Sequence, residues 1–101
     1  MSIRAGELDH AWHKVGLQTR QGRRHIIAQL RLGGKLYLTT MRSRGSGALR
    51  GLLPDLIRQQ MRLDKQQFAD LLNCPLKRDG FLQILADRGV VPPDVLKNSL
   101  S

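Results

Sequence analysis

The stretch that decides the fold is residues 24–42, which read RHIIAQLRLGGKLYLTTMR. It consists of two runs rich in Ile, Leu, Tyr and Thr, separated by Gly33-Gly34. Such runs are typical of β-strands. Two glycines between them predict a hairpin with a two-residue primed turn, because both turn positions need positive φ. We therefore expect an antiparallel pair of strands at the centre of the protein.

The two-residue turn also predicts how the strands pair, because each step away from it brings the next two residues opposite each other. The face expected to point into the core carries Ile26, Ala28, Leu30, Leu32, Lys35, Tyr37, Thr39 and Met41. The opposite face is expected to carry His25, Ile27, Gln29, Arg31, Leu36, Leu38, Thr40 and Arg42. In this register His25 lies directly opposite Arg42.

Helical patterns flank the hairpin on both sides. Apolar residues at helical spacing predict a helix over 7–15, followed by a short strand over 17–20 and a turn at 21–22. Further helices are expected over 55–61, 64–73 and 78–88, the second of them opened by an Asp64–Gln67 capping box. Residues 92–101 are expected to form a C-terminal tail.

This element order predicts a single α+β domain over residues 1–91. It comprises an N-terminal helix, a two- to three-stranded antiparallel sheet, and C-terminal helices packed on one sheet face. The other sheet face is then left to solvent or to a ligand.

Positive charge is concentrated in the first half of the chain. Ten basic and two acidic residues give residues 1–50 a net charge of +8, while seven basic and six acidic residues leave 51–101 at +1. Residues 10–54 contain no Asp or Glu, and their basic residues are Lys14, Arg20, Arg23, Arg24, Arg31, Lys35, Arg42, Arg44 and Arg50. Segregated charge attracts polyanions, so nucleic acid is the first partner to consider. An anionic membrane surface, an acidic protein, or a basic surface with no dedicated ligand are the alternatives.

Composition argues against several other classes of protein. The single cysteine, Cys74, allows neither an internal disulfide nor a cysteine-rich zinc site. Four aromatic residues are too few for a platform that stacks single-stranded bases. No apolar run suits a secretory signal or a membrane span, so we expect a cytoplasmic protein that makes no membrane contact. His10 and His13 are interpreted as surface residues, and no metal or other cofactor is expected.

His25 is the titratable residue with the clearest potential for chemistry. It follows a basic run, RQGRR at 20–24, in which guanidinium groups can hold a phosphate. A neutral imidazole can accept a proton from a ribose 2′-hydroxyl, and adjacent guanidiniums can stabilise the charge that develops on the phosphate. These are the parts needed for metal-free RNA cleavage. The plainer interpretation is a strand histidine that only contacts a phosphate, or has no role.

Three segments resemble the HicA toxin family. Residues 16–27 (GLQTRQGRRHII) are similar to its central motif, in which a glycine followed by an aromatic or aliphatic residue leads to Arg-Gln, then Gly-Ser-His and an apolar strand. Residues 47–50 (GALR), together with 57–60 (IRQQ) and 63–68 (LDKQQF), are similar to the family's closing helices. The resemblance covers about residues 5–73. One departure is that Arg23-Arg24 stands where the family has Gly-Ser, which either hinders close approach of RNA or adds phosphate contacts.

The resemblance implies a fold like a double-stranded-RNA-binding domain, cleavage of mRNA, and control by an acidic HicB-type antitoxin. His25 would be the acid–base residue, with Arg42 and Arg24 at the scissile phosphate. The residues expected to position the RNA are Arg20, Arg23, Arg31, Lys35 and Arg44. The competing hypothesis is a non-catalytic module. It would bind double-stranded RNA, bind DNA through a helix-turn-helix between Asp55 and Arg88, or dock an acidic partner.

Overall fold

The computed structural model describes residues 3–45, 47–49, 51–73 and 75–100. Its strands are β1 (Ile3–Arg4), β2 (Gln18–Gln21), β3 (His25–Leu32), β4 (Lys35–Ser43) and β5 (Ala48–Leu49). Its helices are α1 (Ala5–Lys14), α2 (Leu53–Gln60), α3 (Lys65–Leu72), α4 (Arg78–Asp87) and α5 (Pro93–Leu100).

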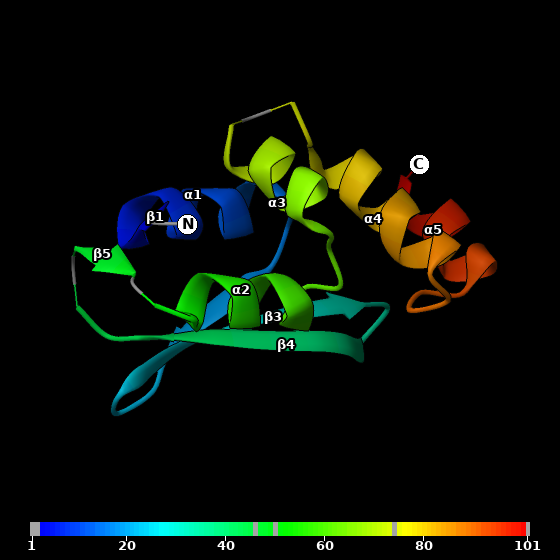
Figure 1. Ribbon diagram of the computed structural model, residues 1–101. Coiled ribbons are helices and arrows are strands. Elements are labelled where there is room, and N and C mark those ends of the chain that lie inside the picture. Colours follow the sequence, from blue (N-terminus) through cyan, green and yellow to red (C-terminus); the bar gives the residue numbers. More distant parts are fainter. Residues whose placement is uncertain (1–2, 46, 50, 74, 101) are drawn as a thin grey trace.

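The main sheet is antiparallel with the strand order β2-β3-β4, and β1 pairs with β5 in a separate two-stranded sheet. Figure 1 shows α1, α2 and α3 on the same side of the main sheet. The predicted α+β fold is therefore confirmed, with an N-terminal helix, a three-stranded sheet and C-terminal helices. The small β1–β5 sheet was not predicted, because two-residue strands leave no periodic pattern in a sequence.

The central hairpin has the predicted turn. Gly33 and Gly34 have φ values of 59° and 82°, and Leu32 pairs with Lys35 across them. Both positions lie in the left-handed region that a primed turn requires and that glycine adopts without steric cost. The two glycines were sufficient to predict this turn, because the need for positive φ concerns only the two turn residues themselves.

The predicted register holds for two pairs and then fails. Arg31 pairs with Leu36 as expected, but Leu30 pairs with Leu38, so β4 contains one extra residue at a β-bulge. A one-residue shift moves every later side chain to the other face of its strand. The prediction that Thr39 and Met41 point into the core is therefore wrong. The core side of β4 carries Leu38, Thr40 and Arg42, all of them buried.

The bulge gives each of these three side chains a suitable environment. Leu38 joins the apolar cluster, and the Thr40 hydroxyl donates to Gln60 Oε1 of α2 at 2.8 Å. The extra residue, Tyr37, is half-buried at the edge of the core, with Lys35 Nζ 5.7 Å from its ring centroid. Packing and hydrogen bonding beyond the hairpin thus select the bulged register.

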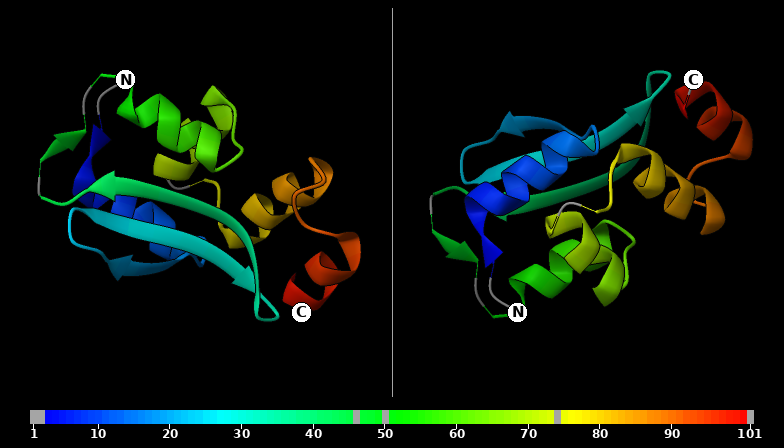
Figure 2. Two further views of the ribbon diagram at one scale, coloured as in Figure 1. Left: turned by 90° about the horizontal axis from the view of Figure 1, so that it is seen from below. Right: turned by 90° about the horizontal axis from the view of Figure 1, so that it is seen from above.

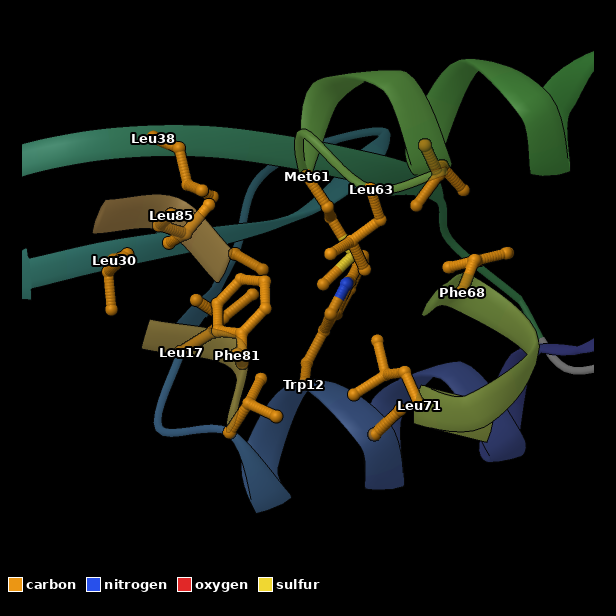
Figure 3. Packing of buried hydrophobic residues seen from close by; sticks show 14 of the residues in the cluster. Trp12, Leu17, Leu30, Leu38, Met61, Leu63, Phe68, Leu71, Phe81 and Leu85 are labelled. Carbon is orange, nitrogen blue, oxygen red and sulfur yellow. The ribbon is translucent and has the colours of Figure 1, made fainter. Parts of the chain in front are cut away.

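The core lies between the helices and the main sheet. Trp12, Phe68 and Phe81 from α1, α3 and α4 are fully buried. In Figure 3, Trp12 points from α1 toward Met61, with Phe81 to one side. The predicted capping box at the start of α3 is also present, because Asp64 Oδ1 accepts from Gln67 N at 2.7 Å and Gln67 Oε1 accepts from Asp64 N at 3.0 Å.

The C-terminal segment is part of this core. A C-terminal tail was expected over residues 92–101, but this segment contains helix α5. The helix begins at Pro93 and packs beside α4. Leu96 on α5 and Val91 before it are buried in the same cluster as Phe81. Helices α4 and α5 therefore complete the apolar layer.

Candidate nucleic-acid interface

The face of the main sheet that points away from α1, α2 and α3 is called the open face. Figure 2 (left) shows the molecule from this side, with α1 behind the strands. Strand pairing places residues of β2, β3 and β4 side by side in rows across this face. From the β2–β3 turn toward the hairpin turn, the rows are His25 with Ser43; Arg20 with Ile27 and Met41; Gln18 with Gln29 and Thr39; and Arg31 with Leu36.

The structure separates the basic residues of the acid-free segment into two groups. Lys14 and Arg42 are used inside the protein; the Lys14 Nζ donates to Leu71 O at 2.7 Å. The other described members of the group have exposed side chains: Arg20, Arg23, Arg24, Arg31, Lys35 and Arg44. Arg50 lies outside the described residues. The exposed six include every residue that we expected to position RNA.

These exposed cations occupy the two ends and one edge of the open face. Arg23 and Arg24 lie in the β2–β3 turn, and Arg44 reaches this turn through long hydrogen bonds to Gly22 O (3.5 Å) and Gln21 Oε1 (3.3 Å). Arg31 and Lys35 lie near the hairpin turn, and Arg20 is on the edge strand. The arrangement can contact phosphates along the length of β3, which spans about 25 Å.

His25 lies at the end of the open face beside the basic β2–β3 turn. Its side chain is exposed and makes no hydrogen bond or ion pair with the described residues, so both ring nitrogens can reach a ligand. The expected pairing of His25 with Arg42 is wrong, because His25 pairs with Ser43 across the bulged hairpin. Arg42 pairs with Ile26 and points to the helix side of the sheet.

Arg42 has an internal role. Its side chain is 5% exposed and binds both carboxylate oxygens of Asp9, with Nε–Oδ1 at 2.8 Å and Nη2–Oδ2 at 2.7 Å. Its Nη1 donates to Ser43 O at 2.8 Å and to Gly45 O at 3.0 Å. One guanidinium therefore joins α1 to the end of β4 and to the loop that follows. A bidentate pair of this kind is geometrically specific as well as strong.

Asp9 is the residue that analysis of the sequence missed. A signal for it existed, since Glu7 and Asp9 are the two acidic residues in the first 54. An arginine buried in that half needs a carboxylate partner, because an uncompensated buried charge is costly. The burial of Arg42, however, followed from the bulge and was not evident in the sequence.

Asp9→Asn is expected to lower the free energy of unfolding by about 2–3 kcal/mol. Loss of one partner of a buried ion pair costs about 3–5 kcal/mol. The cost is smaller here because the Asp9 side chain is 43% exposed, so water reaches the site. Urea unfolding measures the effect. Asp87→Asn, at an exposed helical Asp that accepts from Gln83, is the matched control and should change stability by less than about 0.5 kcal/mol. Equal effects in the two variants would contradict the structural role of the Arg42–Asp9 pair.

The described residues also bear on two other classes of site. None of their helices has the length and apolar character needed to cross a membrane. No group of three or more His, Cys, Asp or Glu in them is arranged to hold a metal ion. Comparison with known proteins adds no assignment: no protein-family model matches the chain, and no curated protein or solved structure is significantly similar to it.

Proposed function

We propose that this protein binds RNA on the open face of the sheet. The observation that supports the proposal most directly is the combination of exposed Arg20, Arg31 and His25 on a face whose residues include no carboxylate. Exposed cations on an acid-free surface attract phosphates and release counterions when they bind them. The helical side is a poorer candidate, because Asp64, which caps α3, and Asp70 on α3 lie among its polar residues.

The composition of the open face favours contacts to phosphates over stacking of bases. Its rows contain no Phe, Tyr or Trp, and their apolar side chains are Ile27, Leu36 and Met41. Aliphatic side chains give bases far less stacking energy than aromatic rings do. The affinity for RNA should therefore depend strongly on the salt concentration. It should depend only weakly on the base sequence of the RNA that lies on this face.

The proposal extends to cleavage of the bound RNA with His25 as the acid–base residue, as the HicA resemblance implies. The His25 imidazole is exposed and has no partner among the described residues, so it can take the proton of a 2′-hydroxyl as that oxygen attacks the adjacent phosphorus. The bond from phosphorus to the 5′-oxygen then breaks, a 2′,3′-cyclic phosphate forms, and the departing 5′-oxygen takes a proton from the imidazolium or from water. Because Arg42 is occupied by Asp9, the cation that stabilises the phosphate would be Arg24 or Arg44 of the β2–β3 end.

The same face would be the site of control if the protein is a toxin of this type. An antitoxin that covers exposed Arg20 and Arg31 would need acidic groups opposite them, in keeping with the HicB-type partner that the resemblance implies. RNA and such a partner would then compete for one surface. The competing interpretation, a non-catalytic binding module, uses the same face and differs only in the absence of cleavage.

Arg31→Gln is expected to weaken RNA binding and to make its salt dependence shallower. One lost phosphate contact reduces the slope of log K against log salt by about 0.7 for a single strand. The measurement is fluorescence anisotropy of a labelled 2′-O-methyl RNA, which resists cleavage, at several salt concentrations. Arg88→Gln, an exposed arginine at the end of α4, is the matched control and should keep the wild-type slope. An unchanged slope for Arg31→Gln would exclude this residue from the interface.

A further inference from the structure

The main sheet has one edge that no described helix or strand covers. Its edge strands are β2 and β4. Helix α2 packs along β4, as Figure 1 shows, and Gln60 of α2 accepts a hydrogen bond from Thr40. Both views of Figure 2 show β2 at the border of the molecule, and all of its residues are exposed. An uncovered edge strand presents main-chain donors and acceptors to another chain.

The hydrogen-bond pattern of the β2–β3 hairpin identifies which main-chain groups of β2 are free. Gly22 N donates to His25 O at 2.8 Å, so Gly22 directs its main-chain groups toward β3. Bonded and non-bonded pairs alternate along an antiparallel ladder, so the main-chain groups of Thr19 and Gln21 point away from β3. Neither residue makes another main-chain hydrogen bond within the described part of the chain. Both therefore offer an N–H donor and a C=O acceptor at the edge.

A cavity of about 330 Å³ lies beside this edge, between β2 and α1. Its lining includes His13 of α1, Thr19 of β2 and Ile26 of β3. A strand added to β2 would lie about 4.8 Å from it, and every second side chain of that strand would point to the helix side of the sheet. The cavity provides space for these side chains, and half-buried Ile26 gives them an apolar surface.

The charges around β2 indicate the chemistry of a partner. Arg20 is exposed on the open face, and exposed Arg23 and Arg24 follow in the turn. Asp9 also lines the cavity, but buried Arg42 donates to both of its oxygens and neutralises its charge. The edge is therefore positive overall. Opposite charges placed across a strand pair are stabilising, so acidic side chains are favoured opposite Arg20.

A second copy of the chain does not suit this edge. In an antiparallel pair of two β2 strands, the outward-pointing residues of one copy must pair with those of the other. This pairing places Arg20 of both copies on one face, close together, where like charges are destabilising. Residues 1–50 of each copy also carry a net charge of +8, which opposes the approach. The arginine that disfavours self-pairing favours an acidic strand.

We propose that β2 is the docking edge for an extended, acidic segment of a partner protein, which adds a fourth strand to the main sheet. Main-chain hydrogen bonds to Thr19 and Gln21 hold the segment, and its alternating side chains give specificity. Its carboxylates lie on the open face beside Arg20, while its uncharged side chains enter the cavity. The inference goes beyond the proposed function, because the edge and its charge do not depend on RNA.

Hydrogen exchange of the two outward amides tests this arrangement. The probe is an acetylated octapeptide of alternating Glu and Val, added to the full-length, ¹⁵N-labelled protein, with its Kd measured by fluorescence anisotropy. When about nine-tenths of the protein is bound, the Thr19 and Gln21 amides should exchange about tenfold more slowly, because they exchange only in the free protein. An octapeptide of alternating Lys and Val, which has the same backbone, should give no protection.

A methylated peptide separates strand addition from attraction between charges alone. The Glu-Val octapeptide with N-methyl groups on its four central residues keeps every charge but loses main-chain donors. It should bind at least about tenfold more weakly, since each lost hydrogen bond costs about 0.5–1.5 kcal/mol. Equal binding of the methylated and unmethylated peptides would overturn the proposal.

Variants of the protein locate the docking edge. Thr19→Pro removes an outward N–H, which an edge strand tolerates, and should weaken binding of the Glu-Val peptide about fivefold. Arg20→Gln, which leaves every main-chain donor in place, should weaken it about threefold. Arg88→Gln, at the end of α4, is the matched control and should keep the wild-type Kd.

The remaining outcomes are equally decisive. No binding of the Glu-Val peptide, or binding that leaves the Thr19 and Gln21 amides unprotected, would overturn the docking edge. Wild-type affinity in both the Thr19→Pro and Arg20→Gln variants would do the same. None of these results bears on RNA binding, which the Arg31→Gln experiment tests separately.

Discussion

A chain that ends at Asn73 is expected to be unfolded at 25 °C, although the resemblance to HicA covers only about residues 5–73. Truncation removes five buried apolar side chains from the one core of the protein: Phe81, Leu82, Leu85, Val91 and Leu96. Each contributes about 1.5–3 kcal/mol when fully buried. Their combined loss is comparable with the whole stability of a typical domain, about 5–15 kcal/mol. The remaining helices would also expose the apolar surface that Phe81 covers.

Circular dichroism and urea unfolding measure this effect. A chain that ends at Pro92 is the matched control, because it lacks α5 but keeps α4 and Val91. It should remain folded and lose about 2–3 kcal/mol, mainly through the loss of Leu96. A cooperative unfolding transition in the 1–73 chain, with stability near that of the full chain, would show that α4 and α5 are accessory.

His25→Ala is expected to slow RNA cleavage by about 10²- to 10⁴-fold, which is the usual contribution of a general acid–base group. The side chain is exposed and makes no hydrogen bond or ion pair within the described part of the chain, so the variant should keep wild-type stability. The assay is a metal-free incubation with a long single-stranded RNA, followed by a denaturing gel. His10→Ala is the matched control, since His10 is also exposed and lies on α1, away from the open face.

The outcomes separate catalysis from binding. Fragments with wild type and His10→Ala, but not with His25→Ala, would support a His25-dependent ribonuclease. Intact RNA with all three proteins, together with salt-sensitive binding, would make the protein a non-catalytic module. Equal cleavage by all three would assign the activity to another residue or to a contaminant.

Local chemistry explains why much of the fold could be predicted. Gly33-Gly34 determines the turn, and Asp64 and Gln67 form the capping box at the start of α3. Gly89 has a φ of 75° just after α4, the left-handed conformation in which a glycine commonly ends a helix. Each feature depends on residues within a few positions of one another, so the sequence pattern contains the whole cause.

The candidate site was predicted less completely. The exposed cations are those expected, because a charged side chain without a partner remains in water. Arg42 departs from this pattern, since its partner Asp9 is 33 positions earlier in the chain. No local rule links two residues so far apart, and the register counted from the two-residue turn without a bulge places Arg42 on the same face as His25.

By itself, the sequence determined the strands of the main sheet, helices α1 to α4, the hairpin turn and the segregation of positive charge. The tertiary structure alone decided the bulge at Leu30/Arg31, and with it which side of β4 faces the helices. The physical reason is that strand register depends on what each face packs against. Burial of Leu38, the Thr40–Gln60 hydrogen bond and the Arg42–Asp9 ion pair all require helices that come from elsewhere in the chain. His25 remains on the open face in either register, whereas the neighbour expected for it belongs to the interior.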